Sequence, residues 1–430
     1  MIRSIPLVML LLFTVPFVAG AQETIKKGDR LDLSRCLEIS LKMHPNISAA
    51  KSAEEVSRTR VGQAESNRYP QINASAGYSR IHAFSGSSSS SLGNKSGSFD
   101  QYSAAVALQQ TIYDFGKTTA QIDIQKLNVG SSGADTENTE EQVTFNVKQA
   151  YFGVLKAKRN RDVAEESVRQ FQQHLEQAKG FFEVGTKPKF DVTKAEVDLS
   201  NAKLNLIRAE SALKLSFVNL NNAMGVPDAS EYTVEDNLSF TKYEIKLDEA
   251  INNAYRTRPD MKSLLSKKAA AERSVELAKK GYYPVINGNA GYSKSGQSFP
   301  LGDGWNLGVA LSFPVFNGFL TKYQVEEASS TLKVIQANEE ALKQGILLDV
   351  QQAFLNLSVA EESIATAELT VKQANENFDI ANGRYAAGVG NPIEVTDAEV
   401  LLSNAKTTYN QSLYDYKVAR AGMEKAMGMR

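Results

Sequence analysis

The stretch YPQINASAGYS, residues 69–79, decides the fold because it returns as YPVINGNAGYS at residues 283–293 of the 430-residue chain. The shared Tyr-Pro and Gly-Tyr-Ser fix an offset of 214 residues (283 − 69). Further along, Gln149-Ala150 returns as Gln352-Ala353 and Gly185 as Gly388, at an offset of 203 (352 − 149). Each copy is far longer than the unit of a repeat array, so the sequence predicts a doubled domain.

The two copies divide the chain after a short leader. We expect a first structural repeat over residues 22–230 and a second over 231–430. Each repeat is predicted to contain a helix, two strands and a helical hairpin: strands 70–83 and 100–113 with hairpin 117–225, then strands 284–296 and 304–316 with hairpin 320–428. The offset changes between the copies because the Ser/Gly-rich loop Phe84 to Phe99 is longer than its counterpart, Lys294 to Gly304.

Residues 1–21 have the pattern of a secretory signal peptide. Arg3 supplies the positive charge, Ile5 to Val18 the apolar run, and Ala19-Gly20-Ala21 a small-residue cleavage pattern. An uncleaved anchor is the alternative, but the run is short for a spanning helix and contains two prolines. The mature protein is therefore expected to be exported.

Composition excludes several classes of site. The formal net charge is −1, which gives no reason to expect binding to nucleic acid. Cys36 is the single cysteine, and His44, His82 and His174 show no spacing typical of metal ligands. We therefore expect no disulfide, no metal site and no cofactor.

The long helices are predicted from an apolar repeat of 3.5 residues. That period keeps one seam facing a partner helix, as in coiled coils, although a globular bundle is the alternative for any single seam. The seam positions are Val143, Val147, Ala150, Val154, Ala157, Arg161, Ala164, Val168, Phe171, Leu175, Ala178 and Phe182 in the first copy, and Ile346, Val350, Ala353, Leu357, Ala360, Ile364, Ala367, Val371, Ala374, Phe378, Ala381 and Tyr385 in the second.

The strands show the other period, with apolar residues alternating with Ser, Asn, Gln, Gly and Ala. A soluble sheet packed on a core also alternates. Here, however, aromatic residues lie near the ends of the segments, as they do at membrane interfaces, and the lengths suit a tilted bilayer crossing. The expected membrane-interface aromatics are Tyr78, Tyr102, Tyr292 and Trp305. The sequence therefore favours strands that contact outer-membrane lipid.

Four strands cannot close a membrane barrel, because barrels have at least about eight strands and lipid tolerates no open edge. Two copies would give about eight strands and a filled lumen, whereas three would give about twelve and leave a channel. The small polar residues of the inner face favour three. The helical hairpins of the same ring would then extend the pore into the periplasm.

In these features the chain resembles the TolC-like outer-membrane efflux protein family, over essentially its whole mature length. The resemblance rests on the two Tyr-Pro strand entries, the strand exits Ile112-Tyr113-Asp114-Phe115-Gly116 and Pro314-Val315-Phe316-Asn317-Gly318, the hairpin turns and the Ala-Met-Gly ends. It implies an α+β membrane protein: a homotrimer with a 12-stranded outer-membrane β-barrel, four strands per chain, continued by a periplasmic α-helical coiled-coil barrel. It also implies a periplasmic adaptor and an inner-membrane pump as partners.

The two hairpin turns are the most informative short segments. In each, a glycine ends one helix and an acid lies in the first turn of the next, which accounts for the pattern without any partner. The resemblance implies in addition that the tips close the pore and contact the adaptor. The residues concerned are Val184, Gly185, Thr186, Pro188 and Asp191 in the first turn and Ala387, Gly388, Val389, Gly390 and Pro392 in the second.

The resemblance also implies an acidic ring that narrows the periplasmic entrance. Glu394 and Asp397 match its positions, and three copies of this pair would bind cations and slow anions. Two departures limit the match. Gly390 stands where some family members carry a basic residue that ties the closed tip, and Lys194 replaces the acid in the first copy.

No motif typical of an enzyme was found: no phosphate-binding loop follows a strand, and no G-x-S-x-G elbow occurs. The leading hypothesis is a passive exit duct of a tripartite efflux or type I secretion system. The alternative is an exported coiled-coil scaffold or adhesin without a pore.

Overall fold

A computed structural model of the chain describes residues 25–83 and 97–429. The expected signal peptide, residues 1–21, and most of the serine-rich loop lie outside these residues. The described chain is mostly helical and has one four-stranded sheet besides a short two-stranded one.

The order of elements in the first half of the chain returns in the second. The helices are α1 (Leu33–Met43), α2 (Pro45–Glu65), α3 (Lys117–Glu183), α4 (Lys189–Met224), α5 (Leu247–Thr257), α6 (Pro259–Lys279), α7 (Leu320–Ala386) and α8 (Pro392–Ala426). The strands are β1 (Arg30–Leu31), β2 (Gln71–Ala83), β3 (Gly97–Tyr113), β4 (Thr233–Val234), β5 (Val285–Gly296) and β6 (Gly302–Ser312).

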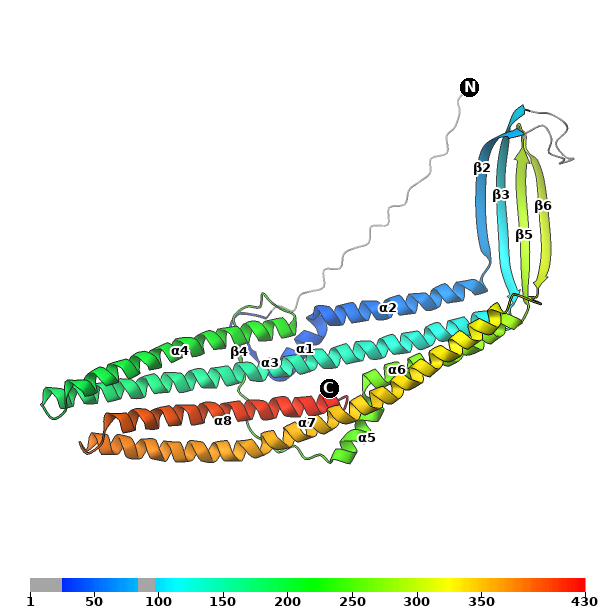
Figure 1. Ribbon diagram of the computed structural model, residues 1–430. Coiled ribbons are helices and arrows are strands. Elements are labelled where there is room, and N and C mark those ends of the chain that lie inside the picture. The colour runs from blue at the N-terminus through cyan, green and yellow to red at the C-terminus, as the bar shows by residue number, and fades with distance from the viewer. Residues whose placement is uncertain (1–24, 84–96, 430) are drawn as a thin grey trace, which may run out of the picture.

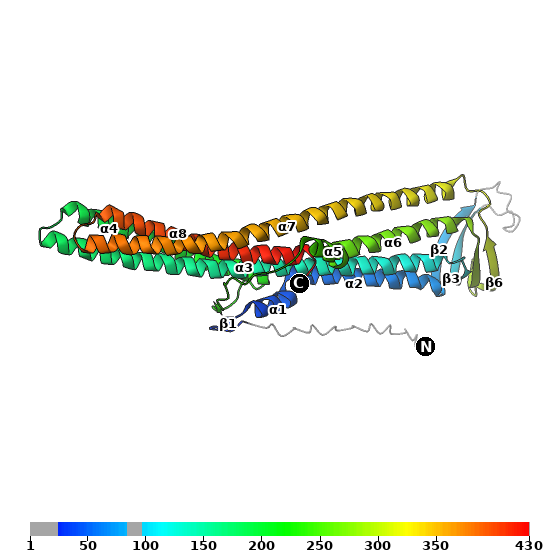
Figure 2. The same ribbon diagram turned by 90° about the horizontal axis from the view of Figure 1, so that it is seen from below.

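The molecule is elongated, with the four-stranded sheet at one end and the α3–α4 and α7–α8 turns at the other (Figure 1). Helices α3 and α7 have 67 residues each and run from the sheet to the turns. At about 1.5 Å per residue, each is about 100 Å long. Figure 2 shows the two hairpins side by side along this axis. Among the described helices, none has a stretch sufficiently long and apolar to span a bilayer.

The sheet is antiparallel throughout and has the order β2-β3-β5-β6. Its register puts the apolar positions of neighbouring strands opposite one another: Ile72 pairs with Leu108, Ala74 with Val106, and Ala290 with Leu307. The other face carries the small and polar residues, such as Asn73, Ala107, Gly291 and Asn306, which follow one another across the four strands. Strands β2 and β6 are its two edges.

Five of the eight strand boundaries differ from the sequence-based prediction, three of them by one or two residues: β2 begins at Gln71, β5 at Val285 and β6 at Gly302. β3 begins at Gly97 rather than at residue 100, and β6 ends at Ser312 rather than at 316. Proline has no backbone N–H to give to a ladder, so Pro314 accounts for the early end of β6.

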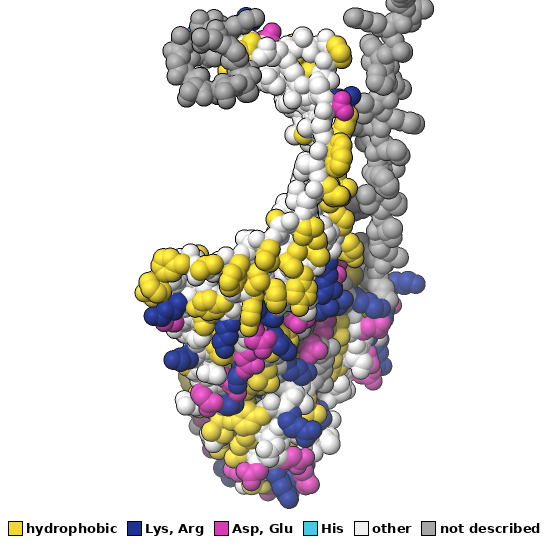
Figure 3. All heavy atoms as spheres, turned by 90° about the vertical axis from the view of Figure 1, so that its right-hand side faces the viewer, with side chains coloured by type: hydrophobic (Ala, Val, Ile, Leu, Met, Phe, Trp, Pro, Cys, Tyr) yellow, Lys and Arg dark blue, Asp and Glu magenta, His cyan; other side chains and the backbone are white. Residues whose placement is uncertain are grey.

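The apolar face of the sheet is not covered by any described helix. Trp305 is 80% exposed and Leu307 is 77% exposed, and the apolar surface continues through Val315 and Phe316 to the start of α7. Figure 3 shows hydrophobic side chains along one side of the sheet and over the end of the helical bundle that joins it. A sheet of this kind has no core of its own in water.

The prediction of a single helix before each strand pair was wrong, because each position holds two helices. Pro45 and Pro259 each occupy the first turn of the second helix, where a backbone N–H would have no partner within the helix. Proline cannot, however, continue the helix that precedes it, so the first helix ends there. The parallel pairing of β1 with β4, which joins the two halves, has no counterpart in the prediction.

The predicted seams account for nine of the eleven buried residues of α7 but for only seven of the eighteen buried residues of α3. In α7, Ile346, Val350 and Leu357 are buried in the apolar cluster that both halves share in the middle of the molecule. In α3, Arg161 interrupts the seam and forms ion pairs with Asp162 and Glu165 instead. Phe182, the last predicted position of the first seam, is exposed.

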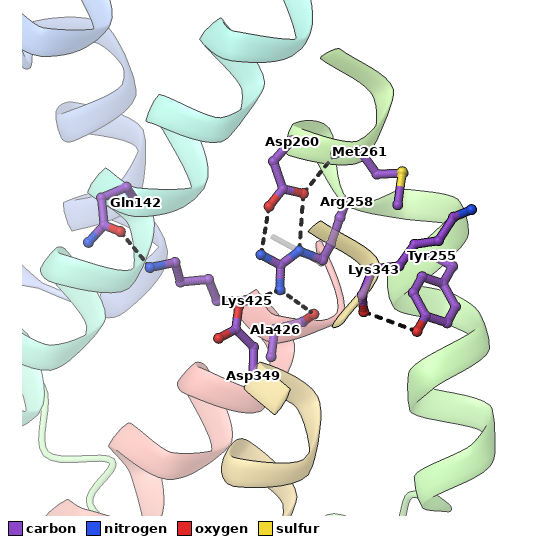
Figure 4. A network of polar contacts seen from close by, with 9 residues as sticks. All are labelled: Gln142, Tyr255, Arg258, Asp260, Met261, Lys343, Asp349, Lys425 and Ala426. Carbon is purple, nitrogen blue, oxygen red and sulfur yellow. Dashed lines mark hydrogen bonds and ion pairs between the residues drawn. The ribbon is translucent and has the colours of Figure 1, made fainter. Parts of the chain in front are cut away.

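A polar network lies in the middle of the molecule, where the α5–α6 corner contacts α7 and the end of α8 (Figure 4). The Arg258 guanidinium donates two hydrogen bonds to Asp260, at 3.1 and 2.7 Å, and one to Asp349 at 3.0 Å. It also donates to the Ala426 carbonyl oxygen at 3.4 Å. This corner therefore holds the base of the second hairpin in place.

Candidate functional site at the hairpin turns

The first turn, between α3 and α4, is built by a glycine in the left-handed region. Gly185 has φ +74°, a conformation that side chains with a Cβ rarely adopt. The Thr186 N–H then donates back to the Phe181 carbonyl oxygen at 2.9 Å. This bond gives a partner to a carbonyl at the end of α3 that has none within the helix. Asp191 lies in the first turn of α4 and is buried.

The second turn, between α7 and α8, repeats this geometry with Gly388 at φ +81°. The Val389 N–H donates to the Arg384 carbonyl oxygen at 3.1 Å, and the Asn391 side chain accepts from the Ile393 N–H at 2.9 Å as the cap of α8. Gly390 passes close to α7, because a Cβ on it would lie 2.7 Å from the Tyr385 nitrogen. This position therefore has no room for a side chain.

Lys187 ties the two turns together. Its Nζ donates to the Gly390 carbonyl oxygen at 3.2 Å and lies 5.8 Å from the centre of the Tyr385 ring. Lys187 and Gly390 are equivalent positions at the offset of 203. The basic residue that Gly390 lacks is thus present on the opposite turn, and its bond crosses from one hairpin to the other.

A second polar bridge joins the hairpins one turn further from the tips. The Thr396 hydroxyl of α8 donates to an Asp198 carboxylate oxygen of α4 at 2.8 Å. Lys194 donates to both oxygens of the same carboxylate at 2.6 Å. Asp198 is buried, so these bonds compensate for its loss of hydration. Lys194, noted above as a departure from the acidic pattern, therefore balances a buried acid.

Glu394 and Asp397 lie one helical turn apart on an exposed face of α8. The Arg384 Nε lies 3.5 Å from a Glu394 carboxylate oxygen, and both side chains are about half exposed. An ion pair of this kind contributes at most about 1 kcal/mol. The two carboxylates are therefore available to ions in the surrounding water, and their role as a gate stays a prediction.

The ten predicted tip residues divide into two groups. Val184 and Val389 are 71% and 72% exposed and project from the ends of the two hairpins. Asp191, Gly390 and Pro392 are buried, so in this conformation they shape the turns and offer no surface to a partner. Contact between an adaptor and the exposed tip residues remains a prediction.

The four predicted interface aromatics lie on the apolar face of the sheet. Tyr78 pairs in register with Tyr102, with ring centres 5.3 Å apart, and Tyr292 pairs with Trp305. Their contact with lipid is a prediction that the fold leaves open.

Sequence reasoning missed the residues that join the hairpins: Lys187, Tyr385, Thr396 and Asp198. Tyr385 was visible only as the last position of a seam. The sequence did show that Lys187 and Gly390, at equivalent positions of the two copies, differ. Local periodicity does not show that these two residues contact each other across the tips.

The family model described as "Outer membrane efflux protein" matches residues 36–226 and 250–429. Outer membrane protein TolC of Vibrio cholerae is 22% identical over 394 residues, covering 89% of this chain and 87% of the relative. Outer membrane protein TolC of Escherichia coli K12 is 21% identical over 402 residues, covering 90% and 80%. A crystal structure of CusC superposes with a TM-score of 0.79 at 17% identity and covers 94% of both chains.

Proposed function

Because the chain belongs to the outer membrane efflux protein family, it is an outer-membrane export protein with a large periplasmic helical part, and we propose that three copies form one continuous exit channel. The observation that carries the proposal is the open sheet: one exposed apolar face, one small and polar face, and two unpaired edges, β2 and β6. In a bilayer, backbone groups on such edges must be paired with other strands.

Closure through a ring of identical chains satisfies both edges at once. The β6 edge of one chain would pair with the β2 edge of the next, and three chains would supply twelve strands. The apolar face would then contact lipid, and the face with Asn73, Gly291 and Asn306 would line the pore. The hairpins of the same ring would form a periplasmic tube.

In this proposal the tube receives its cargo from a periplasmic adaptor that is coupled to an inner-membrane pump. The exposed tips with Val184 and Val389 lie at the end of the molecule farthest from the sheet, which is where a periplasmic partner would reach them. Such a duct is passive, so cargo selection is assigned mainly to the pump.

Fractionation of the full-length protein tests the proposal. A pore-forming ring predicts a trimer in the outer-membrane fraction that resists heating in detergent and conducts ions in planar bilayers. A soluble monomer would overturn the proposal and favour a scaffold without a pore.

Within this channel, Glu394 and Asp397 are proposed to form the acidic ring at the periplasmic entrance. Their exposed carboxylates on three chains would create a local negative field that attracts divalent cations. Single-channel recordings of the variant with both residues changed to Ala test the role. We expect weaker block by divalent cations and a changed conductance; wild-type values for both would remove the assignment.

A further inference from the structure

Near their tips the two hairpins have separate apolar clusters, which are joined by Phe181 of α3 packing against the cluster of α7 and α8. Phe171, Leu175 and Leu199 belong to an apolar cluster of α3 and α4, whereas Phe378 and Leu402 belong to another cluster formed mainly by α7 and α8. The shared cluster in the middle of the molecule includes neither group. Contacts between the hairpins near the tips therefore decide how firmly the two units are held together.

A small cavity of about 20 Å³ lies in this junction, between α3, α7 and α8. It has room for about one water molecule. Its polar lining includes His174 and Gln177 of α3, Asn382 of α7 and Glu399 of α8. The apolar residues Phe171, Phe378 and Val395 complete the walls.

The polar groups at this cavity are buried and incompletely paired. His174 and Glu399 are each 4% exposed. Within the described part of the chain, both ring nitrogens of His174, Oε1 of Gln177 and Oε2 of Glu399 have no hydrogen-bond partner. A buried group without a partner is costly, and the cost rises steeply when the group carries a charge. The protonation states of His174 and Glu399 therefore control the stability of the junction.

The surroundings of Glu399 favour its neutral form. Burial raises the pKa of the carboxyl to about 7, and the Glu166 carboxylate of α3 acts in the same direction. A hydrogen bond with the Ser167 side chain of α3 and the Lys406 charge of α8 oppose the rise in pKa. Lys406 is shared, because its Nζ lies 3.3 Å from a Glu166 carboxylate oxygen.

The surroundings of His174 also favour a neutral side chain. Burial lowers its pKa, against the attraction of Asp198 and Asp191 on α4, and Lys194 on α4 adds to the lowering. From α7, the ring of Tyr385 lies 4.7 Å from the imidazole, centre to centre. Burial therefore favours the neutral imidazole of His174, as it favours the neutral carboxyl of Glu399.

We propose that the cavity lined by His174 and Glu399 is a proton-controlled latch: the two hairpins stay packed while Glu399 is protonated and separate more readily when it is ionised. The sign follows from the carboxyl's raised pKa. The latch is tightest below the carboxyl's ordinary pKa of 4.5 and loosens progressively as the pH rises from there to about 7. Its effect on opening of the entrance rests on the proposed channel function, but the loosening of the junction itself does not.

The chain supplies a matched control. At the offset of 203, the counterpart of Glu399 is Glu196, and the counterpart of His174 is Asn377. Both counterparts are exposed. The substitution Glu196→Gln therefore removes the same charge from a comparable helical position without touching the cavity.

Hydrogen–deuterium exchange of the full-length protein tests the latch. Wild type, Glu399→Gln, Glu399→Asp and Glu196→Gln are each measured at pH 5.5 and pH 8.5, and variants are compared only at the same pH so that intrinsic exchange rates cancel. We expect helix peptides covering 170–180 and 395–405 to exchange at least about tenfold faster in wild type than in Glu399→Gln at pH 8.5, because one pH unit of ionisation cost is a factor of ten. At pH 5.5 the difference should be smaller, because the ionisation cost builds up between the ordinary pKa of 4.5 and about 7.

The controls make the outcome decisive. Glu399→Asp keeps an ionisable group and should retain loosening at pH 8.5, and Glu196→Gln should match wild type at both pH values. Equal exchange in wild type and Glu399→Gln at pH 8.5, or an equal effect of Glu196→Gln, would overturn the latch. If exchange responds as expected but no variant conducts in bilayers, the latch stands and the channel proposal fails. If the variants conduct but exchange does not respond, the channel proposal stands and the latch fails.

Discussion

Replacement of Lys187 by Met should loosen the contact between the two turns. Lys187 gives one charge-assisted hydrogen bond to the Gly390 carbonyl oxygen at 3.2 Å and a long cation–π contact to Tyr385 at 5.8 Å. Met keeps most of the length and apolar volume of the side chain but can make neither contact. The variant therefore isolates the polar tie across the tips.

The size of the effect follows from these two contacts. Hydrogen bonds to charged groups contribute about 1.5–3 kcal/mol, and the lower value applies because Lys187 is only half-buried. A cation–π contact near its distance limit adds at most about 0.5 kcal/mol. Together they amount to about 2 kcal/mol per chain, which corresponds to a change of at least about 30-fold in the ratio of open to closed states of a channel with three such ties.

Single-channel recording in planar bilayers gives this ratio directly, from the times spent in the open and closed states. The control is Lys189→Met, which removes the same charge two residues away from an exposed position with no hydrogen bond or ion pair among the described residues. A ratio for Lys187→Met within about threefold of wild type would refute the reasoning, because RT ln 3 is less than about 0.7 kcal/mol. An equal shift in Lys189→Met would show that charge alone, not the tie, is responsible.

Two further predictions concern the fold. Gly428→Ala should lower the stability by about 2 kcal/mol or more in thermal unfolding, because Gly428 has φ +69° and a Cβ would lie 2.7 Å from Arg258 Cα; Gly383→Ala, in open space on α7, should not. Leu307→Arg on the apolar face of β6 should cost about 2–4 kcal/mol and reduce the heat-resistant trimer in outer membranes, whereas Asn306→Arg on the other face should leave its amount unchanged.

The strands were predictable because their signal is local. A period of two residues fixes which side chains share a face of a sheet. The alternation around Ile72 and Leu307 was therefore sufficient to predict the apolar face. The exact end of β6 depended on Pro314, whose missing N–H outweighs the apolar run that continues to Phe316. The two-residue strands β1 and β4 were missed because so short a segment carries no period.

The site was less predictable because its contacts join segments about 200 residues apart. The sequence showed that Gly390 stands where some family members carry a basic residue. The structure adds that α7 leaves no space for a side chain there. Whether Lys187 or another residue compensates depends on how the hairpins lie together, which no local pattern specifies. For the same reason nothing in the sequence distinguished Glu399, which is buried, from Glu196, which is exposed.

These differences between equivalent positions have a common consequence for the proposed ring. A ring of three doubled chains has two kinds of junction between hairpins, one within each chain and one between neighbouring chains. If the two copies were identical, both kinds would have the same contacts and the same stability. Lys187 opposite Gly390, and His174 beside Glu399, instead place a polar tie and a titratable cavity at the junction within the chain. At the equivalent positions Glu196 matches Glu399 but Asn377 replaces His174, so a junction between chains would lack the histidine. In the proposed ring, loss of the Glu399 proton would loosen the junction within each chain and leave the junction between chains unchanged, so the tips would open without dissociation of the ring.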